Sequence, residues 1–80
     1  MSNKQREAVS LVAHLLGFLK NKIEKIRDSI QDEFRDLPLE EQTDSKEIEY
    51  YTSWYHLEDA QDNIEYVIEV LRKATDEEVE

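Results

Sequence analysis

One stretch of the chain decides the fold: Leu37-Pro38-Leu39-Glu40-Glu41-Gln42-Thr43-Asp44-Ser45. Its proline, the only one in the chain, pushes the preceding residue out of the α-helical region, so a first helix is predicted to end near Asp36. Asp44 and Glu47 have the spacing of a capping box, which predicts that a second helix begins at Asp44 or Ser45. Residues 38–42 can form an extra helical turn within the connection.

The outer ends of both helices also carry signals. Ser2-Asn3-Lys4-Gln5 matches a capping box, and Arg72 and Lys73 place positive charge in the last turn of the second helix, where the helix dipole favours it. The predicted boundaries are a helix over about residues 3–36, a connection over about 37–44, a helix over about 45–75 and a frayed acidic tail over 76–80. The predicted fold class is all-α, an antiparallel hairpin of two long helices.

Apolar residues recur along both predicted helices at the spacing of one helical face. In the first helix they follow an eleven-residue repeat, so their stripe runs nearly straight along the helix. In the second helix the repeat is seven residues, and a line of small residues runs beside it that allows another helix to come close. The first stripe is Val12, Leu15, Leu19, Ile23, Ile26, Ile30, Phe34 and Leu37; the second is Tyr50, Trp54, Leu57, Gln61, Ile64, Ile68, Leu71 and Thr75; the small residues are Ser53, Ala60, Val67 and Ala74.

The N-terminal half of the first helix is apolar over about half of its circumference, more than one partner helix covers. Gly17 costs about 1 kcal/mol relative to alanine inside a helix, which indicates a close helix crossing unless the cost is simply tolerated. We therefore expect two hairpins to pair as a four-helix bundle. The residues expected in this homodimer interface are Val9, Leu11, Val12, Ala13, Leu16, Gly17 and Phe18.

Chain length supports the same expectation. With 80 residues the chain buries only about 60% of the surface that its unfolded form exposes. It has no cysteine, so neither disulfides nor thiolate zinc sites stabilise it, and oligomerisation or a partner remains. The lack of cysteine and the highly charged composition suit the cytoplasm.

Charge is distributed unevenly along the chain. Residues 1–38 contain 7 basic and 6 acidic side chains, a net charge of +1, whereas residues 39–80 contain 3 basic and 14 acidic ones, a net charge of −11. This acidic half disfavours direct binding to nucleic acid and favours a partner with a basic surface. Carboxylates along a helix can imitate a row of phosphates, so an acidic inhibitor is one interpretation and a solubilising surface is another. The acidic face consists of Glu58, Asp62, Glu65 and Glu69.

Aromatic residues gather in the second helix. Tyr50 and Trp54 belong to its apolar stripe, whereas other tyrosines are predicted on the opposite side, among carboxylates and isolated aliphatic residues. Aromatic residues with a polar rim are typical of protein interfaces, although exposed tyrosines without a special role have the same pattern. The predicted partner surface is Ile48, Tyr51, Tyr55, Asp59, Asp62, Tyr66 and Val70.

The sequence has no pattern that indicates catalysis. Neither His14 nor His56 is part of a Glu-x-x-His motif, and no glycine-rich phosphate loop or nucleophile with a base can be assembled. The apolar stretch over residues 8–19 is too short to span a membrane. We expect no catalytic residues, no cofactor, no metal and no membrane contact. The function expected is that of a homo-oligomeric interaction or regulatory module, with an acidic inhibitor and a purely structural oligomer as alternatives.

Overall fold

The protein is a hairpin of two long helices, described by a computed structural model over residues 1–76. Helix α1 spans Asn3–Asp36, a short 3₁₀ turn η1 spans Leu39–Glu41, and helix α2 spans Asp44–Asp76. The predicted all-α hairpin, its connection and the extra turn within it are confirmed. Of the tail predicted to be frayed, Asp76 is the last residue of α2, and residues 77–80 lie outside the described residues.

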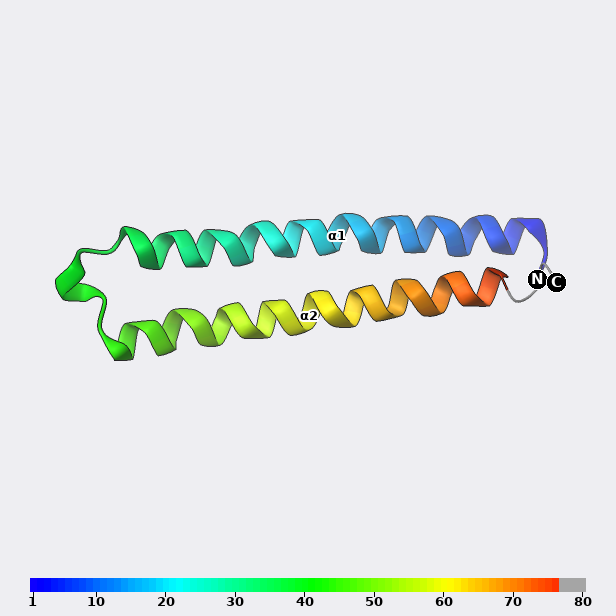
Figure 1. The fold of residues 1–80 in the computed structure, drawn as a ribbon. Helices are drawn as coiled ribbons and strands as arrows, with labels where there is room; N and C mark the ends of the chain where they lie inside the picture. The colour runs from blue at the N-terminus through cyan, green and yellow to red at the C-terminus, as the bar shows by residue number, and fades with distance from the viewer. Residues whose placement is uncertain (77–80) are drawn as a thin grey trace.

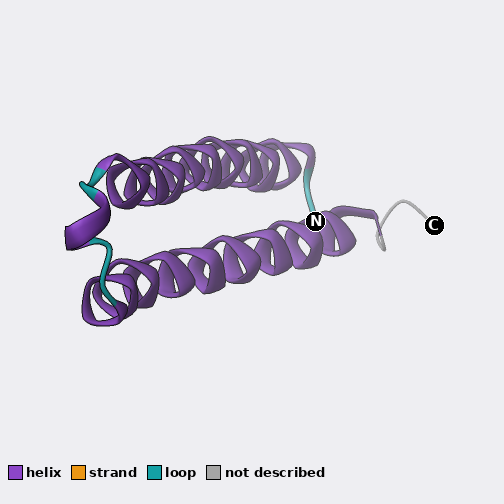
Figure 2. Ribbon diagram, turned by 60° about the vertical axis from the view of Figure 1, so that its left-hand side comes forward, coloured by secondary structure: helices purple, strands orange, loops and turns teal. Residues whose placement is uncertain are grey.

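The two helices run side by side in opposite directions (Figure 1). The hairpin measures 60 × 15 × 13 Å between Cα atoms, so it is a long, narrow rod. A view turned by 60° shows the same two helices, and within residues 1–76 no third layer lies against them (Figure 2). Each helix therefore packs against a single neighbour within the hairpin.

Side chains close the helix ends as elementary capping rules require. The Ser2 hydroxyl accepts a hydrogen bond from the Gln5 backbone N–H at 3.1 Å, and the Gln5 side chain accepts one from the Ser2 N–H at 2.8 Å, which confirms the predicted capping box. At the other end of α1, the Gln42 side chain donates to the carbonyl oxygen of Leu37 at 2.7 Å. For α2, the hydroxyl of Thr43 accepts from the Lys46 N–H at 3.3 Å, so Thr43 caps this helix in place of Asp44.

The face of α1 that packs against α2 differs from the predicted stripe. The prediction was wrong for Val12, Leu15, Leu19 and Ile26, which are exposed. The residues that face α2 instead alternate steps of four and three, because α2 has a seven-residue repeat and α1 must follow the same repeat to stay in contact. Basic residues occupy some of these positions, where α2 offers them partners: Lys20 pairs with Glu65, and the Arg27 guanidinium lies over the Trp54 ring. The less exposed residues are Arg6, Val9, Ala13, Leu16, Lys20, Ile23, Arg27, Ile30, Phe34 and Leu37.

The face of α2 is the predicted one. Tyr50, Trp54, Leu57, Gln61, Ile64, Ile68, Leu71 and Thr75 are all less exposed than their neighbours on the outer side of the helix. Only Ile68 and Gln61 are buried among the described residues, with 8% and 5% of their surface exposed. The hairpin therefore has a thin core, and much apolar surface lies outside it.

Candidate interaction surfaces

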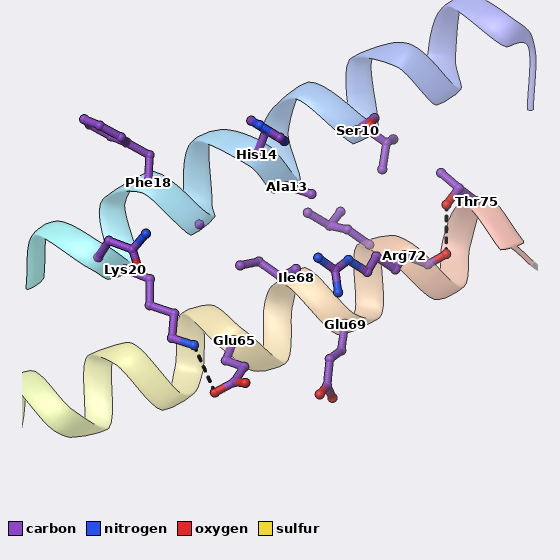
Figure 3. Close-up of a pocket in the computed structure, with 14 residues that line it drawn as sticks. Ser10, Ala13, His14, Phe18, Lys20, Glu65, Ile68, Glu69, Arg72 and Thr75 are labelled. Atoms are coloured by element: carbon purple, nitrogen blue, oxygen red, sulfur yellow. Dashed lines mark hydrogen bonds and ion pairs between the residues drawn. The ribbon is translucent and has the colours of Figure 1, made fainter. Parts of the chain in front are cut away.

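A polar groove of about 660 Å³ runs along one flank of the hairpin, beside the N-terminal half of α1 (Figure 3). Lys20 Nζ forms an ion pair with Glu65 across it at 3.3 Å. A Cβ atom added at Gly17 would meet no atom within 4 Å, so the close crossing that glycine can indicate does not occur inside the hairpin. The groove is lined by Val9, Ser10, Ala13, His14, Gly17, Phe18, Lys20, Asn21, Glu65, Ile68, Glu69, Leu71, Arg72 and Thr75.

The groove shows which residues share a flank. Gly17 follows Leu16 of the α1 contact face, and Glu65 follows Ile64 of the α2 contact face; both line the groove. Because the helices are antiparallel, equivalent heptad positions of the two helices lie on the same side of their interface. The opposite flank must then contain the residues one position before the contact residues. In α1 these precede Ala13, Lys20 and Arg27, and in α2 they precede Gln61, Ile68 and Thr75.

By the same rule Gln5, Glu33 and Ser53, which precede Arg6, Phe34 and Trp54, lie toward the ends of that opposite flank. Its middle is apolar, and we call this part the apolar flank. It consists of Val12, Leu19 and Ile26 from α1 and Ala60, Val67 and Ala74 from α2. The four larger side chains, Val12, Leu19, Ile26 and Val67, are 46%, 50%, 53% and 43% exposed. One flank of the rod is thus polar, and the middle of the other is apolar.

Contacts across the hairpin set the order of these residues along the flank. The Gln61 side chain donates to the Lys20 carbonyl at 3.4 Å, and the Arg27 guanidinium lies 5.1 Å from the centre of the Trp54 ring. This register places Val67 between Val12 and Leu19, and Ala60 between Leu19 and Ile26. Side chains of α1 and small residues of α2 therefore alternate, and the surface they make has ridges and hollows that another helix can fill.

The residues predicted to form the homodimer interface do not share one surface. Val9, Ala13, Gly17 and Phe18 line the polar groove, Leu16 is half-buried on the face toward α2, and only Val12 lies on the apolar flank. Leu11 is exposed on the outer side of α1. The sevenfold spacing of the small residues of α2 is visible in the sequence, but the eleven-residue repeat predicted for α1 does not place its apolar residues beside them.

A second surface, which we call the tyrosine hollow, lies at the start of α2. It is a shallow, open surface between side chains of α2 alone, lined by Asp44, Glu47, Ile48, Tyr51, Thr52 and Tyr55. The structure thus brings together three residues of the predicted partner surface, Ile48, Tyr51 and Tyr55. The sequence predicted that Tyr51 lies on the side of α2 opposite α1. In the structure its ring instead contacts α1, with its centre 5.7 Å from that of the Phe34 ring.

The remaining residues of the predicted partner surface lie farther along α2. Tyr66 is eleven residues beyond Tyr55, about 16 Å along a helix, and does not line the hollow. Asp59, Asp62, Tyr66 and Val70 are all exposed. Within the predicted acidic face, Asp62 and Glu69 are exposed, Glu58 is half-buried and Glu65 is paired with Lys20. The predicted surfaces are therefore divided among separate regions of the helix.

Among residues 1–76, neither helix contains a segment long and apolar enough to cross a lipid bilayer. In the same part of the chain, no three side chains of the metal-binding types gather into a candidate metal site. Comparison with protein-family models, curated proteins and solved structures found no match to this chain. The interaction surfaces are therefore interpreted from their own geometry and chemistry.

Proposed function

We propose that the protein acts by protein association, in which two copies pair through their apolar flanks as a four-helix bundle. The observation that carries this proposal is that both helices supply apolar side chains to one flank, while the other flank has an ion pair and an open groove. The paired form presents the acidic outer surface of α2 to partner proteins.

Exposed apolar surface supports pairing. Val12, Leu19, Ile26 and Val67 lie together and are each about half exposed, and Leu15 extends the surface on the outer side of α1. Together they leave on the order of 400 Å² of contiguous apolar surface, and patches of this size on soluble proteins commonly mark binding sites. Burying each side chain stabilises a complex by about 1–2 kcal/mol at the usual value per unit of apolar area.

The shape and charge of the apolar flank favour a second copy as its occupant. The flank is a two-helix surface with alternating large and small side chains, and an identical flank turned about a twofold axis offers the complementary pattern. None of its six residues is charged. Pairing there therefore leaves no charge unpaired and adds the second layer of helices that the thin hairpin core lacks.

Two matched pairs of substitutions test the proposed dimer. Ile26→Glu and Val67→Glu place a charge on the apolar flank, whereas Ile48→Glu and Thr52→Glu place the same charge at exposed positions of α2 away from that flank. In a dilution series followed by analytical ultracentrifugation, we expect both flank variants to weaken the dimer at least about 100-fold, because charge buried without a partner costs several kcal/mol. The control variants should keep the wild-type mass.

The outcomes separate three arrangements. If Ile26→Glu dissociates the dimer but Val67→Glu does not, α1 alone forms the interface. The proposal that both helices contribute to it is then wrong. If neither variant changes the mass of a wild-type dimer, the interface lies elsewhere. A wild-type protein that is monomeric and helical at all concentrations contradicts pairing altogether.

A second candidate function is that of an acidic inhibitor that occupies a basic site on another protein. The observation that favours it is the net charge of −11 over residues 39–80, together with exposed carboxylates at Asp59, Asp62 and Glu69. Neutralising Asp62 and Glu69 as amides should then weaken binding to the target and reduce its dependence on salt. Binding that is unaffected by both changes would count against this function.

A further inference from the structure

We propose that the tyrosine hollow is a docking site for a segment of another protein that carries lysine or arginine beside a large apolar side chain. Ile48, Tyr51 and Tyr55 give the hollow aliphatic and aromatic surface, and Asp44 and Glu47 give it carboxylates. This inference does not depend on the proposed dimer, because the two surfaces lie on different sides of α2.

The position of the hollow follows from the heptad repeat. Tyr51 is seven residues before Glu58 and fourteen before Glu65, so it lies on the same flank of α2 as the polar groove. The apolar flank, at Ala60, Val67 and Ala74, is on the other side of the contact face. Two copies paired through their apolar flanks therefore leave both hollows open to partners.

Ring contacts hold the walls of the hollow in place. The Tyr51 ring lies 5.7 Å from Phe34 and 6.1 Å from Trp54, and the Tyr55 ring meets Trp54 edge to face at 5.1 Å. Arg27 covers Trp54 from α1 and fixes the indole in turn. A surface whose side chains are already ordered loses little conformational entropy on binding, and this lowers the cost of association.

Ile48 and Tyr55 nevertheless remain accessible. They are 68% and 60% exposed, and they lie on opposite sides of Tyr51 along the helix. An apolar side chain of a partner can insert between them, with the tyrosine hydroxyl groups available for hydrogen bonds. Tyrosine is enriched where protein interfaces concentrate their binding energy.

Charge specifies the partner. The hollow is lined by two carboxylates and no basic residue, and η1 adds Glu40 and Glu41 nearby in the chain. Over residues 39–62 the chain contains 8 acidic side chains and one basic one, Lys46, whose Nζ lies 3.9 Å from Glu49. The field at the hollow therefore attracts a cation, and tyrosine rings also bind cations on their faces.

A different protein fits this description better than a second copy of the chain. A second copy brings a net charge of −10 and is repelled by an acidic surface. Its own basic stretch is already partly engaged, since Lys20 pairs with Glu65 and Lys22 lies 5.2 Å from the centre of the Phe18 ring. A cationic and apolar segment of a partner meets neither obstacle.

The experiment uses a fluorescent helical peptide in which leucine at every third or fourth position alternates with lysine, and a control peptide with glutamate in place of lysine. We expect the lysine peptide to bind the full chain in anisotropy titrations and the glutamate peptide not to bind. Tyr55→Ala should weaken binding about tenfold or more, whereas Tyr66→Ala, which removes an equally exposed tyrosine of α2, should leave it unchanged.

Charge reversal gives the second comparison. The double variant Asp44→Lys/Glu47→Lys should lose the same binding, and Asp62→Lys/Glu69→Lys, with the same change in net charge outside the hollow, should retain most of it. Equal losses in both double variants, or no effect of Tyr55→Ala, would mean that only the overall charge acts and would overturn the proposal. A fall in solution mass caused by Tyr55→Ala would identify a second copy as the occupant and would also overturn it.

The monomeric Ile26→Glu variant makes this test independent of the proposed dimer. Because Ile26 lies on the apolar flank, that variant should bind the lysine peptide as the wild type does. Failure of the dimer and failure of the docking site are then seen in different measurements. The first is a change of mass, and the second is a change of peptide affinity.

Discussion

Gln61 is a polar residue in the most buried position of the hairpin. Its Nε2 atom donates to the Lys20 carbonyl oxygen at 3.4 Å, at the long end of hydrogen-bond distances, and its Oε1 atom has no hydrogen-bond partner among the described residues. A buried acceptor without a partner costs about 1–3 kcal/mol. The same position in the heptad holds Trp54 one repeat earlier and Ile68 one repeat later, so a hydrophobic residue fits the surroundings.

We therefore expect Gln61→Leu, which nearly conserves side-chain volume, to raise the free energy of unfolding by about 1–2 kcal/mol. Urea denaturation followed by circular dichroism measures the change. Asn63→Leu is the control, because it makes a similar replacement at an exposed position of α2 and should change stability by less than about 0.5 kcal/mol. A loss of stability in Gln61→Leu would indicate that the amide is needed to set the register of the helices.

At the scale of the element, α2 could be predicted closely from the sequence and α1 could not. The stripe of α2 contains Trp54, Leu57, Ile64 and Ile68, and no other face of this helix has a continuous line of large aliphatic residues. In α1, apolar residues occupy two adjacent stripes, and periodicity does not say which stripe faces the partner. The prediction chose the more hydrophobic one, whereas the structure turns toward α2 a stripe that includes Lys20 and Arg27.

The choice between the two stripes depends on the partner helix. A face that includes Lys20 and Arg27 is acceptable opposite α2 because Glu65 pairs with the first and the Trp54 ring receives the second. These contacts join residues far apart in the sequence, so the sequence of α1 alone does not predict them. The same limit applies to the apolar flank, whose residues come from both helices, and to Tyr51, whose partner Phe34 belongs to α1.

A substitution at Gly17 distinguishes two ways in which α1 could contact a second copy, through the apolar flank or through the polar groove. Because an added Cβ atom meets nothing within 4 Å, Gly17→Ala should cause no clash in the hairpin and should raise the free energy of unfolding by about 0.5–1 kcal/mol through helix propensity. Thermal denaturation measures this gain, and ultracentrifugation measures the mass. If pairing uses the apolar flank, the dimer keeps its affinity, since Gly17 is on the opposite flank. A dimer weakened by this one methyl group would instead place the second copy in the polar groove, against Ala13 and Gly17.

At the scale of the whole molecule, the two proposed surfaces respond to salt in opposite ways. Each copy has a net charge of −10, so two copies repel one another while they approach, and the apolar flank that joins them contains no charge. The tyrosine hollow instead attracts its partner through Asp44 and Glu47. Raising the salt concentration weakens both the repulsion and the attraction, because the Debye length falls from about 10 Å at 0.1 M to about 3 Å at 1 M.

We therefore expect that sodium chloride raised from about 0.05 M to 0.5 M tightens the dimer several-fold and weakens binding of the lysine peptide by tenfold or more. Dilution series by ultracentrifugation and anisotropy titrations measure the two effects on one preparation. Asp62→Asn/Glu69→Gln serves as a control, since it changes the net charge from −10 to −8 without altering either surface and should reduce the salt dependence of dimerisation. A dimer that salt weakens must be held by charged contacts, and the apolar flank could then not be its interface. Peptide binding that salt leaves unchanged would mean that Ile48, Tyr51 and Tyr55 act without the carboxylates, so that the partner would be apolar and not cationic.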